Sequence, residues 1–161
     1  MQPDEVTFVA ALAAETGFAL DIAAECARDF SRIWVACLEP TLPRPDAFLL
    51  AWIAADELHL IAVGSHPERR RAGLAELLVN SLLAFARKQH SRLVILEVRR
   101  SNRAALALYR KFGFTVSRLR RGYYAQPEED GIEMQLVYDE YGTVVPVPDE
   151  VPWPEVTECL T

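Results

Sequence analysis

Residues 66–78 read HPERRRAGLAELL, an arginine-rich turn that leads into an amphipathic helix. Gly73 and Ala75 carry little side-chain bulk where the helix begins, so the backbone N–H groups near them are free to point at a ligand. Such groups lie at the positive end of the helix dipole and bind phosphate, and the arginines at 69–71 add charge beside them. The GxxxxGK[ST] pattern of a nucleotide P-loop and the GxGxxG pattern of a dinucleotide fold are both absent. The turn therefore predicts a pyrophosphate site of another kind. A surface loop ahead of a core helix is the alternative that these residues alone leave open.

Upstream of this turn, the apolar pattern predicts helices followed by strands. The amphipathic segment 6–29 is broken at Gly17, which indicates two short helices or one kinked helix. Three apolar runs follow, at residues 32–39, 47–55 and 58–63. They are separated by a two-proline connection and by a turn at Asp56-Glu57, so three consecutive antiparallel strands are expected.

Downstream of Pro67, the spacing of apolar residues changes from a period of 2 to one of 3.6, which predicts a helix of about 17 residues. The run LVILEV at 93–98 is short and rich in β-branched residues, and it predicts a buried strand. Ser101 or Asn102 is expected to cap a further helix that ends at Gly113. The apolar side of that helix is predicted to carry Ala105, Leu108, Tyr109 and Phe112.

The last two strands are predicted at residues 114–119 and 132–138, with the long loop RRGYYAQPEEDG between them. The resulting order of elements is typical of a mixed α/β fold, with a mainly antiparallel central sheet and flanking helices. A single domain over residues 1–141 is expected. A proline-rich, acidic tail at 142–161 should follow it and form neither helix nor strand.

The composition limits the class of protein. Hydrophobic residues make up 51% of the 161-residue chain and charged residues 25%, which argues against a fibrous or wholly disordered protein. No apolar run is long enough for a membrane span, and the start MQPDE lacks the positive charge of a secretion signal, so a cytoplasmic protein is expected. Cys26, Cys37 and Cys159 form no CxxC pair, which argues against a disulfide framework or a zinc site.

The net charge of -6 conceals an uneven distribution. Residues 68–121 hold 14 basic and 3 acidic side chains, whereas both flanking segments are acidic. A positive segment in an acidic chain indicates a small bound polyanion rather than a nucleic-acid surface, because a nucleic-acid-binding domain is usually basic overall. The alternative is that these arginines lie on solvated helix faces and pair with acidic residues.

Several motifs resemble a known family. Arg70-Arg71-Ala72-Gly73-Leu74-Ala75 fits the R/Q-x-x-G-x-G/A signature of the GCN5-related N-acetyltransferases (GNAT). The segments LEVRRSNRAALALYRKFGF at 96–114 and RRGYYAQPEEDGIEMQL at 120–136 resemble corresponding segments of the ribosomal-protein alanine N-acetyltransferases of that family. The resemblance covers about residues 58–138. Two positions differ from that subfamily: Gly64-Ser65-His66 stands in place of one acidic residue, and Ala75 replaces the commoner glycine.

The resemblance implies a GNAT fold and acetyl-CoA as cosubstrate. No set of residues has the spacing of metal ligands, so no metal is expected. The resemblance also implies that the turn holds the pyrophosphate of acetyl-CoA through Arg70, Arg71, Ala72, Gly73, Leu74 and Ala75. Backbone groups of Ala62 and Val63 would hold the pantetheine arm and polarise the thioester carbonyl. Asn102 would contact CoA, with simple helix capping as its alternative role.

Glu97 is the candidate general base. Strand alternation places it near the end of an apolar strand, where a carboxylate must be paired, hydrated or functional. The resemblance implies that Glu97 takes a proton from the incoming amine, directly or through water. An ion pair with Arg99 or Arg100 is the alternative. His59 is a weaker candidate, because a single histidine on an apolar strand face is usually structural.

Tyr109 is the candidate general acid. Its place on the apolar side of a helix is that of an ordinary core tyrosine. The resemblance implies that its hydroxyl protonates the departing thiolate, as a phenol of pKa about 10 can for a thiol of pKa about 8.5. By the same resemblance, Tyr123 and Tyr124 help to form an acceptor-peptide groove. The alternative is that they are loop aromatics packed on the sheet.

The sequence therefore predicts an acyltransferase that moves an acetyl group from acetyl-CoA to a primary amine, by direct attack with a glutamate base and a tyrosine acid. The favoured acceptor is the N-terminal α-amino group of a protein such as a ribosomal protein. A GNAT enzyme acting on a small amine or a lysine, and a non-catalytic acyl-CoA sensor or interaction module, are the alternatives. Neither a membrane nor a nucleic acid is expected as a partner.

Overall fold

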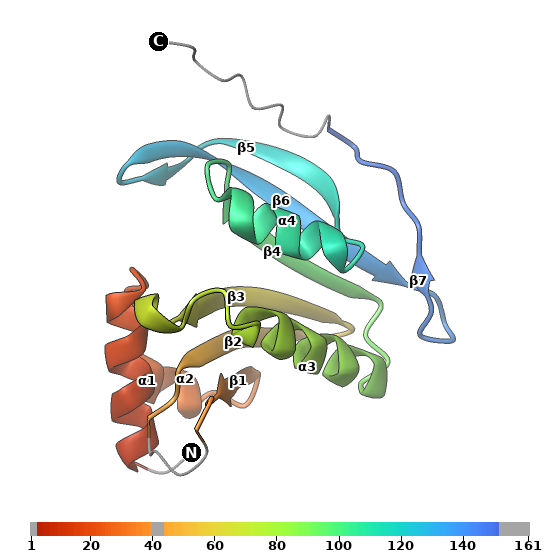
Figure 1. Ribbon diagram of the computed structural model, residues 1–161. Helices are drawn as coiled ribbons and strands as arrows, with labels where there is room; N and C mark the ends of the chain where they lie inside the picture. Colours follow the sequence, from red (N-terminus) through yellow and green to blue (C-terminus); the bar gives the residue numbers. More distant parts are fainter. Residues whose placement is uncertain (1–2, 40–43, 152–161) are drawn as a thin grey trace. The chain divides into compact units, whose positions relative to one another are not determined.

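The computed structural model describes residues 3–39 and 44–151, which form two compact units that divide between Val94 and Ile95 (Figure 1). Each unit combines strands with helices, so the expected mixed α/β fold is confirmed. Within the described ranges, no helix is both long and apolar enough to cross a membrane.

Three strands of the first unit form an antiparallel meander. They are β1 (Ser31–Ala36), β2 (Ala47–Ala54) and β3 (Glu57–Ser65). β1 pairs with β2, and β2 pairs with β3, both antiparallel, as the three apolar runs predict. The tight turn between β2 and β3 lies at Ala55 and Asp56, one residue earlier than expected, and Ala55 has a φ of 55°.

Two helices precede these strands. Of the two possibilities predicted for residues 6–29, two short helices are therefore observed and not one kinked helix. α1 (Pro3–Glu15) and α2 (Ile22–Cys26) are separated at Gly17, whose φ of 88° ends the first helix. Asp21 caps α2, because its carboxylate accepts a hydrogen bond of 3.0 Å from the Ala24 amide. The helices close a core that contains Val9, Leu12, Ala13, Ile22, Phe48, Leu50 and Ala62.

The helix that follows the arginine-rich turn is α3 (Leu74–Lys88). It has 15 residues, and a separate 3-10 turn, η1 (Pro67–Arg69), stands before it, so the predicted helix was slightly too long. α3 packs against all three strands of the first unit. It buries Leu74, Leu78, Val79, Leu82, Leu83 and Ala86, as the 3.6-residue period predicts.

The second unit is built on strands β4 (Leu93–Arg99), β5 (Thr115–Ala125), β6 (Glu128–Tyr138) and β7 (Val144–Val145), with helix α4 (Arg103–Lys111). β6 lies between β4 and β5 in the sheet, and β7 pairs with β6. β4 shows strict alternation, with Val94, Leu96 and Val98 buried. The predicted strand at 93–98 is therefore confirmed.

The buried side of α4 differs in part from the predicted one. Leu106 and Tyr109 are the buried residues of the helix, while Ala105, Leu108 and Phe112 are only half-buried. Asn102 is the N-cap residue rather than Ser101, and Gly113 follows the helix with a φ of 89°, as a C-terminal glycine should.

The predicted long loop at 120–131 is wrong, because β5 and β6 continue through it as one hairpin. Only Gln126 and Pro127 form the turn. The register of the hairpin shifts between Arg120 and Tyr124, where β5 has extra residues, and Gly122 has a φ of 58° there. This bulge and the polar residues on both faces remove the period-2 pattern by which a strand is recognised.

The first part of the predicted irregular tail is also held to the second unit. β7 pairs with the end of β6, and the Glu150 amide donates a hydrogen bond of 2.9 Å to the Val116 carbonyl oxygen. The Asp149 carboxylate accepts hydrogen bonds from Arg110 and, at 2.6 Å, from the Val116 amide. Residues 152–161 of the tail lie outside the described residues.

We expect Asp149→Asn to lower the free energy of unfolding by about 1 kcal/mol at neutral pH, because it removes the ion pair with Arg110. Burial raises the pKa of Asp149, but the hydrogen bonds from Arg110 and Val116 and the Arg110 charge outweigh it and leave the pKa low. A carboxylate with a lowered native pKa stabilises the fold above its unfolded pKa of about 3.9 and loses that effect as the pH falls through the native pKa. Urea unfolding should therefore show a difference at pH 7 that shrinks below about pH 4. A constant difference would contradict the ion-pair origin.

Candidate functional site

The turn before α3 has the backbone shape of an anion site. Gly73 is the N-cap residue with a left-handed φ of 79°, and Arg71 also has a positive φ, 64°. A left-handed residue other than glycine costs about 1–2 kcal/mol, so the strain at Arg71 marks this turn as a constrained one. Gly73 provides no side-chain cap, which leaves the N–H groups of the first helical turn without a capping acceptor.

The arginines of this turn differ in their surroundings. Arg69 forms an ion pair with Asp46 at 3.5 Å. Arg70 and Arg71 are exposed, as are Ala72 and Gly73, whereas Leu74 is buried beneath the turn and Ala75 is half-buried. Residues 70–73 therefore form an exposed stretch of chain directly before α3.

A bulge in β3 lies close to Ala62 and Val63, the candidate pantetheine contacts. Leu50 pairs with Ala62, whereas the next residue, Ala51, pairs with Leu60, so Ile61 is the extra residue of β3. A bulge disturbs the ladder and re-aims the backbone groups beside it. Sequence reasoning missed this feature, because the apolar run LHLIAV continues through it without a break.

Glu97 projects from the half-exposed face of β4, as alternation predicts. Its Oε1 accepts a hydrogen bond of 2.6 Å from Nη1 of Arg120, and the two side chains are 31% and 35% exposed. The expected ion-pair partners, Arg99 and Arg100, are bound elsewhere: Arg99 to Glu129 at 3.4 Å and Arg100 to Asp130 at 3.5 Å. Arg120 belongs to β5, and no local pattern in the sequence indicates that it pairs with Glu97.

Tyr123 and Tyr124 lie on β5 rather than in a loop, and each stacks with an arginine. The Arg120 guanidinium carbon is 4.1 Å from the centroid of the Tyr123 ring, and that of Arg99 is 4.1 Å from the centroid of the Tyr124 ring. The two rings meet edge to face with centroids 5.0 Å apart. We call Glu97, Arg99, Arg120, Tyr123 and Tyr124 the arginine–tyrosine cluster.

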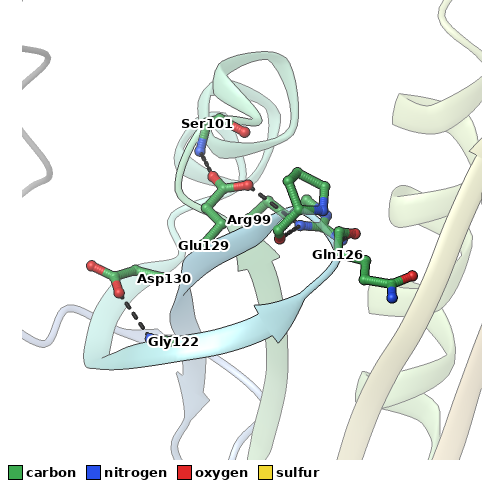
Figure 2. A network of polar contacts seen from close by, with 7 residues as sticks. Arg99, Ser101, Gly122, Gln126, Glu129 and Asp130 are labelled. Carbon is green, nitrogen blue, oxygen red and sulfur yellow. Dashed lines mark hydrogen bonds and ion pairs between the residues drawn. The ribbon is translucent and has the colours of Figure 1, made fainter.

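Arg99 also clamps the tip of the hairpin (Figure 2). Its Nη2 donates to the Gln126 carbonyl oxygen at 3.0 Å, and its Nη1 donates to the Pro127 carbonyl oxygen at 3.3 Å. Glu129 accepts from Arg99 and from the Ser101 amide, so the hairpin is joined to the segment that follows β4. These contacts join the β5–β6 hairpin, which carries both tyrosines, to the end of β4, the strand that carries Glu97.

Tyr109 is buried on α4 and packs against Phe114, with ring centroids 5.7 Å apart. Burial, and to a smaller extent the Tyr124 phenol, raises the pKa of Tyr109 well above its usual value. Burial is also the main cause that raises the pKa of Tyr124, and Glu97 is among the charges that contribute. Both phenols therefore keep their protons at neutral pH.

Two other candidates, Asn102 and His59, have ordinary structural contacts. The side-chain Oδ1 of Asn102 caps α4 by accepting a hydrogen bond of 3.2 Å from the Ala105 amide, which is the capping role given as its alternative. Nε2 of His59 lies 3.0 Å from a carboxylate oxygen of Glu57. In the described part of the chain, no cluster of His, Cys, Asp or Glu side chains could hold a metal ion.

The candidate residues fall into two groups. The turn at 70–75 and the strand residues Ala62 and Val63 belong to the first unit. Glu97, Asn102, Tyr109 and the tyrosine pair belong to the second unit. The first group offers backbone amides and positive charge to an anion, and the second offers a carboxylate and two protonated phenols.

The chain belongs to the Acetyltransferase (GNAT) family, which matches residues 8–114. The match begins at Phe8, so residues 8–57, in which the motifs gave no resemblance, are part of the family domain as well.

Comparison with individual proteins agrees with this assignment. The chain is 38% identical to the [ribosomal protein bS18]-alanine N-acetyltransferase of Salmonella typhimurium over 95 residues, which cover 58% of the chain and 64% of that protein. The matched region is thus less than two thirds of the length of the curated relatives. The crystal structure of the Escherichia coli ribosomal-protein-S18-alanine N-acetyltransferase aligns with a TM-score of 0.74 at 22% identity, over 93% of this chain and 94% of that one. Arabidopsis thaliana NAA60 in complex with acetyl-CoA aligns with a TM-score of 0.71 at 15% identity, over 84% and 94%. The two structural likenesses support the fold.

Proposed function

We propose that this protein transfers the acetyl group of acetyl-CoA to the N-terminal α-amino group of an acceptor protein, such as a ribosomal protein. The observation that carries this proposal is the half-exposed Glu97 carboxylate, held in the arginine–tyrosine cluster of a GNAT chain. The similarity to enzymes named ribosomal protein bS18-alanine N-acetyltransferases supports the same class of acceptor.

In this proposal, the turn before α3 binds the pyrophosphate of acetyl-CoA. The amides of the first helical turn and the exposed Arg70 and Arg71 supply hydrogen-bond donors and positive charge, and no metal is needed to neutralise the phosphates. Backbone groups beside the β3 bulge, at Ala62 and Val63, hold the pantetheine arm and polarise the thioester carbonyl. Tyr123 and Tyr124 line the acceptor side.

Glu97 acts as the general base in the proposed reaction. The amine nitrogen attacks the thioester carbonyl carbon, the C–N bond forms as the C–S bond breaks, and the proton of the amine passes to Glu97 directly or through water. At pH 7, deprotonating an α-amino group of pKa about 7.8 costs about 1 kcal/mol, whereas a lysine of pKa about 10.4 costs nearly 5 kcal/mol. A single carboxylate base therefore suits an N-terminal amine better than a lysine.

Tyr109 assists the leaving group in this mechanism. Its raised pKa makes complete proton transfer to a thiolate of pKa about 8.5 unfavourable. The buried phenol is better suited to donate a hydrogen bond that stabilises the developing thiolate, which takes a proton from solvent after the C–S bond has broken. The role that the sequence suggested, a full proton donor, is therefore refined to that of a hydrogen-bond donor.

Replacing Tyr109 by Phe is expected to lower kcat about 10- to 100-fold, because one hydrogen bond to the transition state is lost. The ring remains packed against Phe114, so the midpoint of thermal unfolding should change by only a few degrees. Steady-state kinetics and thermal unfolding on the same preparation check this. A kcat equal to that of the wild type would show that Tyr109 is only a core residue.

The experiment that tests the proposed function is mass spectrometry of a peptide library incubated with acetyl-CoA. The library contains peptides with free N-terminal alanine, N-terminally blocked peptides with internal lysines, and free polyamines. We expect a mass increase of one acetyl group on the free α-amines. Acetylation confined to lysines or polyamines contradicts the N-terminal acceptor, and binding of acetyl-CoA without any product contradicts the enzymatic function.

A further inference from the structure

The ion pair between Glu97 and Arg120 joins the proposed base to a permanent positive charge. Among the described residues, Arg120 is the one that donates a side-chain hydrogen bond to the Glu97 carboxylate. The bond runs from Nη1 of Arg120 to Oε1 of Glu97. An arginine keeps its charge throughout the accessible pH range. The base is therefore part of a neutral pair and not an isolated negative charge.

The second contact of Arg120 fixes it in this position. Its guanidinium stacks on the Tyr123 ring at 4.1 Å, and that ring lies directly over Gly131 of β6. A Cβ atom at Gly131 would stand 2.9 Å from Cδ1 of Tyr123, so only glycine leaves room for the ring there. Arg120 also pairs with Gly131 in the strand register. The bulge, the glycine and the tyrosine thus position the guanidinium beside Glu97.

The other charged groups around the pair are engaged with one another. Arg99 binds Glu129 and the hairpin carbonyl oxygens, and Arg100 binds Asp130. The charge that an approaching amine meets at Glu97 is therefore set chiefly by Arg120. A protonated amine that reaches Glu97 also comes close to the Arg120 guanidinium. The two positive charges then repel each other.

We propose that Arg120 is a specificity-determining residue that selects acceptor amines by their charge. This inference rests on the proposed function. By cancelling the charge of Glu97, Arg120 removes the attraction that an isolated carboxylate would exert on ammonium groups. At pH 7.8 about half of an α-amine of pKa about 7.8 is neutral, whereas the neutral fraction of a lysine of pKa about 10.4 is lower by about two orders of magnitude. The pair therefore admits N-terminal amines and discriminates against lysines and polyamines.

The test compares wild type with Arg120→Gln on two acceptors, a peptide with a free N-terminal alanine and spermidine. We expect the ratio of kcat/KM values, α-amine over spermidine, to fall about 10-fold or more in the variant, mainly because KM for spermidine falls. The spermidine KM of the variant should rise with added salt, since an uncompensated carboxylate attracts the cation through a screened interaction. Arg120→Lys retains the charge and should restore most of the selectivity.

Arg118→Gln is the matched control, because Arg118 lies on the same strand, is 69% exposed and faces a different carboxylate, Glu133, at 3.9 Å. Its selectivity should equal that of the wild type. If Arg120→Gln does not fold, Arg120→Met, whose stem can still cover Tyr123, serves for the same comparison. The inference is overturned if the folded variant keeps the wild-type ratio of kcat/KM values and the wild-type salt dependence of the spermidine KM. Acetylation of the alanine peptide by the wild type would still uphold the proposed function in that case. A wild type that acetylates neither acceptor overturns both.

Discussion

Replacing Glu97 by Gln is expected to lower kcat for an N-terminal peptide by about 10²- to 10³-fold, which lies within the range of about 10²- to 10⁴-fold that a general base contributes. The amide fills nearly the same space but cannot accept the proton of the attacking amine. The loss should be larger at pH 6.5 than at pH 8.5, because more of the acceptor, with a pKa of about 7.8, carries a proton at the lower pH. The measurement is the pH profile of turnover for both proteins.

The binding of acetyl-CoA separates a catalytic from a structural effect of this substitution. Calorimetric titration should give nearly the same affinity for Glu97→Gln and the wild type. The free energy of unfolding should change by less than about 1 kcal/mol, because the ion pair with Arg120 is partly exposed. Glu128→Gln is the matched control, since Glu128 is an exposed glutamate of the same unit, at the start of β6. Wild-type turnover in Glu97→Gln would remove Glu97 from the mechanism.

Sequence reasoning succeeded where burial imposes a period on the chain. The strand β4 is recognisable because Val94, Leu96 and Val98 are all buried and the residues between them are not. The helix α3 is recognisable because a 3.6-residue apolar stripe faces three strands. In both elements the buried side chains lie within a few residues of one another along the chain, so a short segment of sequence is enough to predict the helix or the strand.

It failed where geometry depends on partners far along the chain. The hairpin of β5 and β6 has polar side chains on both faces and a bulge at Gly122, so its sequence looks like a loop. The partner of Glu97 is Arg120, 23 positions away, and that pairing depends on the register that the bulge sets. The bulge in β3 at Ile61 was missed for the same reason, because it is visible only against the pairing with β2.

The candidate site shows the same division. The turn at 70–75 could be predicted because glycine, small residues and arginines stand together before a helix, and each acts locally. The raised pKa of Tyr109 could not be predicted from sequence, since it depends on how completely the fold buries the phenol. Local backbone chemistry was therefore more predictable than side-chain electrostatics.

Replacing Gly73 by Val is expected to lower the affinity for acetyl-CoA by at least about 10-fold. The φ of 79° at this position costs a β-branched residue about 1–2 kcal/mol, and relaxation toward negative φ would turn the amides of the first helical turn away from the pyrophosphate. A Cβ at Gly73 has no protein atom within 4 Å, so the side chain clashes with nothing in the fold. Calorimetric titration with acetyl-CoA measures the loss.

Gly142→Val is the matched control for this prediction, because Gly142 has a φ of 76° and equally open surroundings. Both variants should lose a similar free energy of unfolding, but only Gly73→Val should lose affinity. Acetyl-pantetheine provides a second comparison, since it has the thioester but no pyrophosphate. Its kcat/KM should be the same for the wild type and Gly73→Val, because the turn has no phosphate to bind in that reaction. An equal loss of kcat/KM with acetyl-CoA and with acetyl-pantetheine would mean that Gly73 stabilises the fold and does not contribute to pyrophosphate binding. The anion site would then have to lie elsewhere in the chain.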